Sequence, residues 1–101
     1  MSKYALVISD DPESILKAHA DEIRDFKKAD WLYDGIVFQE DVTSAEIKEK
    51  VFANREFLPS IIIDGSSYLT AAKFSAEGWE DNVRKFIDLS QPALISFWVI
   101  D

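Results

Sequence analysis

The sequence predicts a single α/β domain with a mixed β-sheet, and three observations carry this prediction. Short apolar runs rich in Val and Ile alternate along the chain with amphipathic segments of helical spacing. Pro59 leads into the apolar run Ile61–Ile63, which ends in the turn signal Asp64-Gly65. The 101 residues are 48% hydrophobic, enough for one core without a metal or disulfides. We therefore expect one domain over residues 1–101, without a linker or a repeat.

The beginning of the chain predicts a strand followed by a helix. Tyr4–Ile8 is a compact apolar run, typical of a buried strand. Asp11 is a good N-cap and Pro12 suits the first helical position, so a helix should begin at Pro12 and fade near Ala29. Its inward stripe comprises Ile15, Leu16, His19, Ala20, Ile23 and Phe26.

A second strand and a second helix are expected next. The turn signal Tyr33-Asp34-Gly35 precedes the short apolar run Ile36–Phe38, which predicts a strand. Thr43-Ser44-Ala45-Glu46 is a capping box, and the helix that it begins should extend to about Asn54. The inward side of this helix is expected to be Ile47, Val51 and Phe52.

The hairpin and a third helix follow. The strand after Pro59 should turn at Asp64-Gly65 and pair with a strand around Ser67–Ala71. Ser75 is expected to cap a helix that ends within Asp88–Pro92, with Trp79, Val83, Phe86 and Ile87 on its inward face. The order β-α-β-α-β-β-α predicts a mixed four-stranded sheet with helices on both faces.

Residues 93–100 form an eight-residue, nearly unbroken apolar run that the four-stranded order does not use. The run is dense in strand formers, so we expect an added C-terminal strand rather than a helix. One interpretation buries this strand in the domain's own sheet. The alternative leaves it on an edge, where a homodimer through this strand, or another partner, would cover it.

The composition excludes several classes of function. The chain has no cysteine, which rules out disulfides, thiolate metal sites and thiol redox chemistry of its own. A net charge of -8 argues against direct nucleic-acid binding, which needs concentrated Lys and Arg. The apolar run near the N-terminus is too short for a signal peptide or a membrane span, so a cytoplasmic location without membrane association is expected.

The proline, the Ile61–Ile63 run and the Asp64-Gly65 turn resemble the third-strand hairpin of glutaredoxins and other thioredoxin-fold proteins. The resemblance covers residues 4–88 in element order and implies a thioredoxin-like sheet, with a cis bond at Leu58-Pro59. The family's Cys-Pro-x-Cys motif matches Asp11-Pro12-Glu13-Ser14, which keeps the proline and replaces both cysteines. A carboxylate at a helix N-terminus cannot form a disulfide. The family's glutathione-binding Gly-Gly pair falls at about Leu69-Thr70, so glutathione binding is not expected either.

The remaining candidates for chemistry favour structural roles. His19 is the only histidine and lies on the inward stripe of the first helix, which indicates a core or boundary residue rather than a catalytic base. The carboxylates of Asp10-Asp11-Glu13 and Glu40-Asp41 could bind Mg²⁺ or Ca²⁺, but neither group has the spacing of a known cation loop. We therefore expect no catalytic residue, no metal and no cofactor.

Two functions from different classes remain. The first is a redox-inactive, thioredoxin-like domain that binds a protein partner in a groove formed by Asp11, Pro12, Leu58, Pro59 and Tyr68, with the loop aromatics Trp31 and Tyr33 as further contacts. The alternative is a small acidic inhibitor or nucleic-acid mimic that occupies a basic surface of an enzyme or of a nucleic-acid-binding protein. A carboxylate enzyme that uses a hard metal ranks last.

Overall fold

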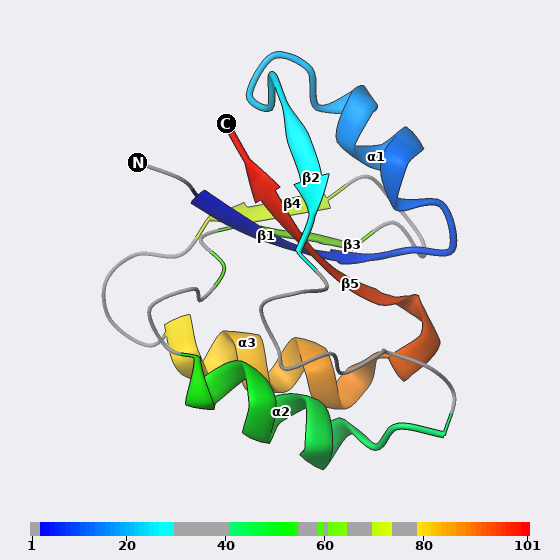
Figure 1. Ribbon diagram of the computed structural model, residues 1–101, viewed down its shortest axis with the longest axis vertical. Helices are drawn as coiled ribbons and strands as arrows, with labels where there is room; N and C mark the ends of the chain where they lie inside the picture. Colours follow the sequence, from blue (N-terminus) through cyan, green and yellow to red (C-terminus); the bar gives the residue numbers. More distant parts are fainter. Residues whose placement is uncertain (1–2, 30–40, 55–58, 60, 65–69, 74–78) are drawn as a thin grey trace.

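The computed structural model describes residues 3–29, 41–54, 59, 61–64, 70–73 and 79–101. In these residues the chain forms a mixed sheet of five strands in the order β2-β5-β1-β3-β4, with helices on both faces (Figure 1). The strands are β1 Lys3–Ile8, β2 Phe26–Lys28, β3 Ile61–Asp64, β4 Thr70–Lys73 and β5 Ile95–Ile100. The predicted α/β class with a mixed sheet is thus confirmed.

The central strand β1 pairs with β3 in parallel and with β5 in antiparallel orientation. Because successive side chains of a strand point to opposite faces, its four buried residues divide between two cores. Ala5 and Val7 contribute to one core, and Leu6 and Ile8 contribute to the other. A stretch of strand that is apolar on both faces needs cover on both faces.

The helices supply that cover unequally. Helix α1 (Pro12–Ala18) lies on one face, and α2 (Ser44–Ala53) and α3 (Trp79–Leu89) lie together on the other (Figure 1). The core under α1 consists of Ala5, Val7, Ile15, Leu16, Ile23, Ile61, Ile63, Trp98 and Ile100. The core under α2 and α3 consists of Leu6, Ile8, Ala29, Ile47, Val51, Ile62, Val83, Ile87, Ile95 and Phe97.

Helix α2 forms where its sequence signals place it. The Thr43 hydroxyl accepts a hydrogen bond from the Glu46 backbone N–H at 3.2 Å, and the Glu46 carboxylate accepts one from the Thr43 N–H at 3.1 Å. This reciprocal capping box satisfies two donors that the first helical turn leaves unpaired. The helix is followed by Asn54 as C-cap, and Ile47 and Val51 are buried, as the sequence predicts.

The first helix is shorter than the sequence predicts, and the expected extension to Ala29 is wrong. Helix α1 ends at Ala18, and the His19 carbonyl accepts hydrogen bonds from the N–H groups of Glu22 and Ile23 in the turn that follows. Phe26–Lys28 then forms β2, which pairs antiparallel with β5. Pairing with this apolar strand overrides the helical spacing of the local sequence.

The C-terminal strand lies inside the sheet, between β1 and β2. It begins at Ile95 rather than at residue 93, because Pro92–Leu94 form a short 3-10 turn in which the Leu94 N–H donates to the Gln91 carbonyl at 2.9 Å. Along Trp98–Ile100, β5 is paired on both sides. This position removes the exposed edge that motivated a homodimer through β5.

The hairpin strands β3 and β4 pair antiparallel, with Asp64 opposite Thr70, and β4 extends to Lys73. The predicted strand at residues 36–38, the Gly65 turn position and the Ser75 cap lie outside the described residues. Helix α3 ends at Leu89, within the predicted range, and buries Val83 and Ile87. The described part of the chain does not confirm a thioredoxin-like arrangement of these elements.

Candidate functional site

The turn between β1 and α1, which matches the position of the Cys-Pro-x-Cys motif of glutaredoxins, is built around Asp11. One oxygen of its carboxylate accepts a hydrogen bond from the Ser14 hydroxyl at 2.7 Å, and the other accepts one from the Ser14 backbone N–H at 3.4 Å. The Asp11 N–H donates to the Ser9 hydroxyl oxygen at 2.9 Å, and Pro12 occupies the first helical turn. Asp11 therefore serves as the N-cap of α1, as predicted, and its carboxylate is engaged in that role.

The other anchor of the predicted groove, Pro59, is buried at the far end of the parallel pair. Ala5 of β1 lies opposite Ile61 of β3, and Ile8 lies opposite Asp64. Pro59 precedes Ile61, whereas Asp11 follows Ile8. Because the two strands run in the same direction, the four paired positions separate Asp11 from Pro59 by at least about 10 Å. The structure does not bring these two predicted site residues together.

The remaining predicted site residues lie outside the described residues. These are Trp31, Tyr33, Leu58 and Tyr68. Of the predicted set, the structure therefore places the exposed Asp11 and the half-buried Pro12 at the start of α1, and Pro59 in the interior.

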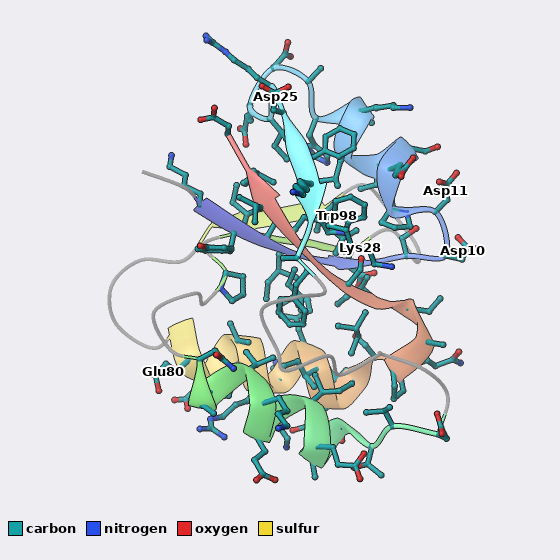
Figure 2. All side chains as sticks on the ribbon, in the orientation of Figure 1. Asp10, Asp11, Asp25, Lys28, Glu80 and Trp98 are labelled. Carbon is teal, nitrogen blue, oxygen red and sulfur yellow. The ribbon has the colours of Figure 1, made fainter. Side chains whose placement is uncertain are left out.

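The carboxyl ends of the parallel strands β1 and β3 share one edge of the sheet, and this edge is acidic. Asp10 and Asp11 follow β1, and Asp64 ends β3 beside Ile8. Figure 2 shows Asp10 and Asp11 at the turn that leads into α1. Open α/β sheets bind ligands at such an edge. Carboxylates accept hydrogen bonds and repel anions, so this edge disfavours phosphate-bearing ligands.

Residues 10–25, which carry α1 and the turn after it, form the most acidic surface described in the structure. Six carboxylate residues and two basic residues give this segment a net charge of -4, half of the -8 of the whole chain. All eight side chains are exposed: Asp10, Asp11, Glu13, Lys17, Asp21, Glu22, Arg24 and Asp25. We call this region the acidic α1 surface. Sequence reasoning treated these acids separately, although the charge density of residues 10–25 signals the group.

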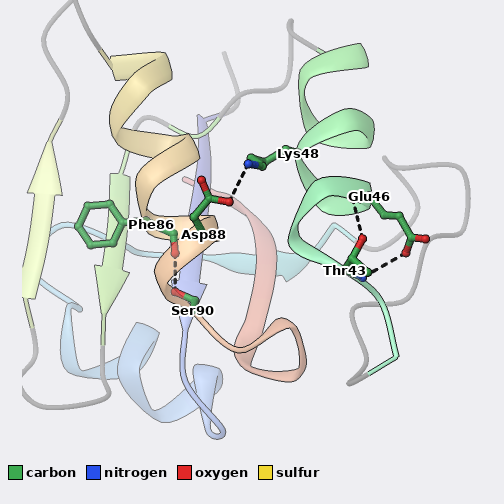
Figure 3. A network of polar contacts seen from close by, with 6 residues as sticks. All are labelled: Thr43, Glu46, Lys48, Phe86, Asp88 and Ser90. Atoms are coloured by element: carbon green, nitrogen blue, oxygen red, sulfur yellow. Dashed lines mark hydrogen bonds and ion pairs between the residues drawn. The ribbon is translucent and has the colours of Figure 1, made fainter.

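The opposite layer carries a second polar network, which joins α2 to α3. The Lys48 ammonium lies 2.7 Å from the Asp88 carboxylate (Figure 3). Hydrogen bonding by Lys48, above all, lowers the pKa of Asp88 below its ordinary value of 3.8, with smaller contributions from the Lys48 charge, a Ser44 hydrogen bond and the Arg84 charge. Helices α2 and α3 together carry five acidic and four basic residues, a net charge of -1, so this face has no concentration of one charge.

The described residues hold no group of three or more His, Asp or Glu side chains arranged to bind a metal ion. Within the same residues, no helix has both the length and the apolar character needed to cross a membrane. The chain has no cysteine, so a thiol reaction centre is absent from its sequence. The exposed carboxylates of the described residues can accept hydrogen bonds and attract cations.

Comparisons with known proteins identify no relative. No family model matches the chain, and neither a curated protein nor a solved structure shows significant similarity to it.

Proposed function

We propose that this chain acts without catalysis, by binding a basic surface of a protein partner through the acidic α1 surface. The observation that carries this proposal is the concentration of charge on one layer of the fold. Residues 10–25 hold half of the net charge of the chain, and all of their charged side chains are exposed. Complementary charge on a partner would raise the association rate and fix the orientation of the complex.

The chemistry of this surface favours one kind of partner. Clustered carboxylates repel the phosphates of nucleic acids and attract clustered Lys and Arg. A protein surface that holds nucleic acid carries such a basic cluster. The proposal therefore includes the acidic inhibitor, in which the carboxylates of this chain take the place of phosphates on a basic protein surface.

A thioredoxin-like groove is a weaker basis for binding. That site requires Asp11 and Pro59 to face each other, and the parallel register of β1 and β3 places them at opposite ends. The Asp11 carboxylate is also committed to Ser14 as a helix cap. The acidic α1 surface requires neither of these residues as a direct contact.

The test compares two variants that lose the same charge from different faces. The first, Asp10→Asn/Glu13→Gln/Asp21→Asn, neutralises three exposed residues of the acidic α1 surface and keeps the Asp11 cap. The control, Asp41→Asn/Glu49→Gln/Asp81→Asn, neutralises three exposed residues in or near α2 and α3. Each tagged protein is used to capture partners from a lysate of the organism that encodes it, at about 0.05 M and about 0.5 M NaCl.

The wild type and the control should capture the same basic protein at low salt, and the first variant should lose it. The dissociation constant of the isolated complex should rise steeply with salt, because exposed charges are screened beyond about 10 Å at 0.1 M ionic strength. Capture that is equal for both variants, or that persists unchanged in high salt, would rule out the acidic α1 surface as the contact.

A further inference from the structure

In the part of the chain that the structure describes, the outer side of β2 is an edge of the sheet. Among the described residues, β2 pairs only with β5, and Lys27 lies opposite Val99. The Ala29 N–H donates to the Phe97 carbonyl at 2.8 Å, and the Asp101 N–H donates to the Asp25 carbonyl at 2.9 Å. Positions 25, 27 and 29 therefore bond toward β5. By antiparallel alternation, Phe26 and Lys28 direct their backbone N–H and C=O groups to the outer edge.

The side chains along this edge alternate between the two faces of the sheet. Asp25 and Lys27 are exposed, and their spacing of two residues places them on one face. Phe26 faces the other way and packs edge-on against Trp98, with ring centroids 5.7 Å apart and an interplanar angle of 75°. Figure 2 shows Asp25 near the start of β2 and Lys28 at its end. One face of the edge thus carries an acid and a base that are two residues apart.

We propose that the outer edge of β2 pairs antiparallel with the same edge of a second copy, around a two-fold axis at Phe26. In this register, each Phe26 exchanges its backbone N–H and C=O with Phe26 of the other copy. Asp25 of each copy lies opposite Lys27 of the other. Both residues bond inward to β5, so they form non-hydrogen-bonded pairs, in which opposing side chains approach most closely.

The charges select this register over its neighbours. An antiparallel pair centred on Lys27 places the two copies of Lys27 opposite each other, and a pair centred on Lys28 does the same for Lys28. Like charges directly opposite each other destabilise a sheet. The register centred on Phe26 instead forms two attractive pairs, and this charge complementarity identifies a second copy as the occupant of the edge.

The interface is short. The N–H of Arg24 donates to the Asp101 carbonyl at 2.8 Å, so Arg24 and Asp25 both face one residue beside β5. In a β-bulge, two residues of one strand lie opposite a single residue of the neighbouring strand. Such a bulge bends the strand and ends regular pairing. A contact of this size falls below the roughly 1,000 Å² of a stable complex, so self-association is expected only above about 0.1 mM.

Lys27 has an alternative role that the experiment can distinguish from pairing with a second copy. Charged side chains on an edge, especially Lys, also keep strands from pairing. If Lys27 only blocks pairing, then Lys27→Asp should leave self-association absent or increase it. If Lys27 pairs with Asp25 of a second copy, Lys27→Asp should weaken self-association, because it places two carboxylates opposite each other.

The test is sedimentation equilibrium of the purified chain from about 10 µM to about 1 mM, at about 0.02 M NaCl. We expect the wild type to dimerise weakly, and Lys27→Asp and Asp25→Lys each to raise the dissociation constant at least about tenfold. The exchanged variant Asp25→Lys/Lys27→Asp restores both charge pairs and should return to within about threefold of the wild type. Lys85→Asp on α3 and Glu49→Lys on α2 repeat each charge change on exposed residues away from the edge and should leave the constant unchanged.

A wild type that remains monomeric to the highest concentration overturns the proposal. It is equally overturned if Lys27→Asp associates more strongly, or if the exchanged variant fails to recover. Far-UV circular dichroism of each variant establishes that it is folded. If a reversal unfolds the chain, Lys27→Gln serves in its place and should weaken dimerisation by a smaller factor.

Discussion

Lys48 of α2 and Asp88 of α3 form an ion pair with 2.7 Å between nitrogen and oxygen, and this pair joins the two helices on one face of the sheet (Figure 3). A second contact lies one helical turn away on both helices. The Arg84 guanidinium stands 4.0 Å from the centroid of the Phe52 ring. Residues four apart on a helix share a face, so α2 and α3 meet through two polar contacts in successive turns.

Replacing Asp88 with Asn should destabilise the chain at neutral pH but not in acid. The pKa of Asp88 is lowered in the folded chain, mainly by the hydrogen bond from Lys48, so its contribution is present above the ordinary value of 3.8 and is lost as the pH falls through the lowered pKa. Urea unfolding of wild type and Asp88→Asn should therefore give midpoints that differ near neutral pH and converge in acid. In a Lys48→Gln background, the effect of Asp88→Asn on the urea midpoint should depend less on pH. A difference between wild type and Asp88→Asn that is the same at all pH values would show that the pKa of Asp88 is not lowered in the folded chain.

Ser96→Ala should destabilise the chain by about 1–3 kcal/mol, because it leaves a buried donor without an acceptor. The Ser96 hydroxyl is buried, accepts a hydrogen bond from the Trp98 indole N–H at 2.8 Å and lies 3.4 Å from the Val7 carbonyl, to which it donates. The free energy of unfolding from urea titration measures the effect. Trp98→Phe should cost less in the Ser96→Ala background than alone, since the two residues form one network. If the losses in free energy of unfolding of the two single variants simply add in the double variant, Ser96 and Trp98 are not coupled by this hydrogen bond.

His19→Leu should maintain or increase the free energy of unfolding. The Nε2 atom of His19 is buried and has no hydrogen-bond partner among the described residues, which is unfavourable for a polar atom. Leucine removes that atom and extends the apolar stripe of Ile15, Leu16 and Ile23. His19→Asn, which keeps a polar side chain, is the matched comparison and should be less stable than His19→Leu. The opposite ranking would show that His19 makes a polar contact in solution.

Thr43→Ala should reduce the free energy of unfolding by about 1 kcal/mol, because the first turn of α2 loses its side-chain cap. Thr43→Ser keeps the hydroxyl that accepts from the Glu46 N–H and should retain most of the stability. Thermal and urea unfolding of both variants measure the difference. Equal stability of Thr43→Ala and wild type would mean that the capping box contributes nothing.

The sequence was most informative where the signals are local. The α2 capping box and the buried positions Ile47 and Val51 depend on residues within a few positions of each other, and the structure has them as predicted. The end of α1 depends instead on β5, which pairs with Phe26–Lys28. No pattern within residues 12–29 indicates that distant partner. The helical spacing of these residues therefore predicts a helix that is longer than α1.

The separation of Asp11 from Pro59 could not be predicted from the sequence for a related reason. The sequence indicates that Pro59 precedes a strand and that Asp11 follows one, but neither pattern encodes the relative direction of the two strands. The parallel pairing of β1 and β3 determines that the residues lie apart. The acidic α1 surface was accessible from sequence, because its charged residues are close together in the chain.

The position of β5 between β1 and β2 constrains the order in which the sheet can assemble during synthesis. β1 and β2 are both made before α2, yet among the described strands they join one sheet only through β5, which begins at Ile95. A nascent chain that has not reached Ile95 therefore lacks the strand that connects them, and the two cores on either side of β1 lack Phe97 and Trp98. Contacts between residues so distant in sequence close slowly. The domain should accordingly complete its sheet only after β5 leaves the ribosome.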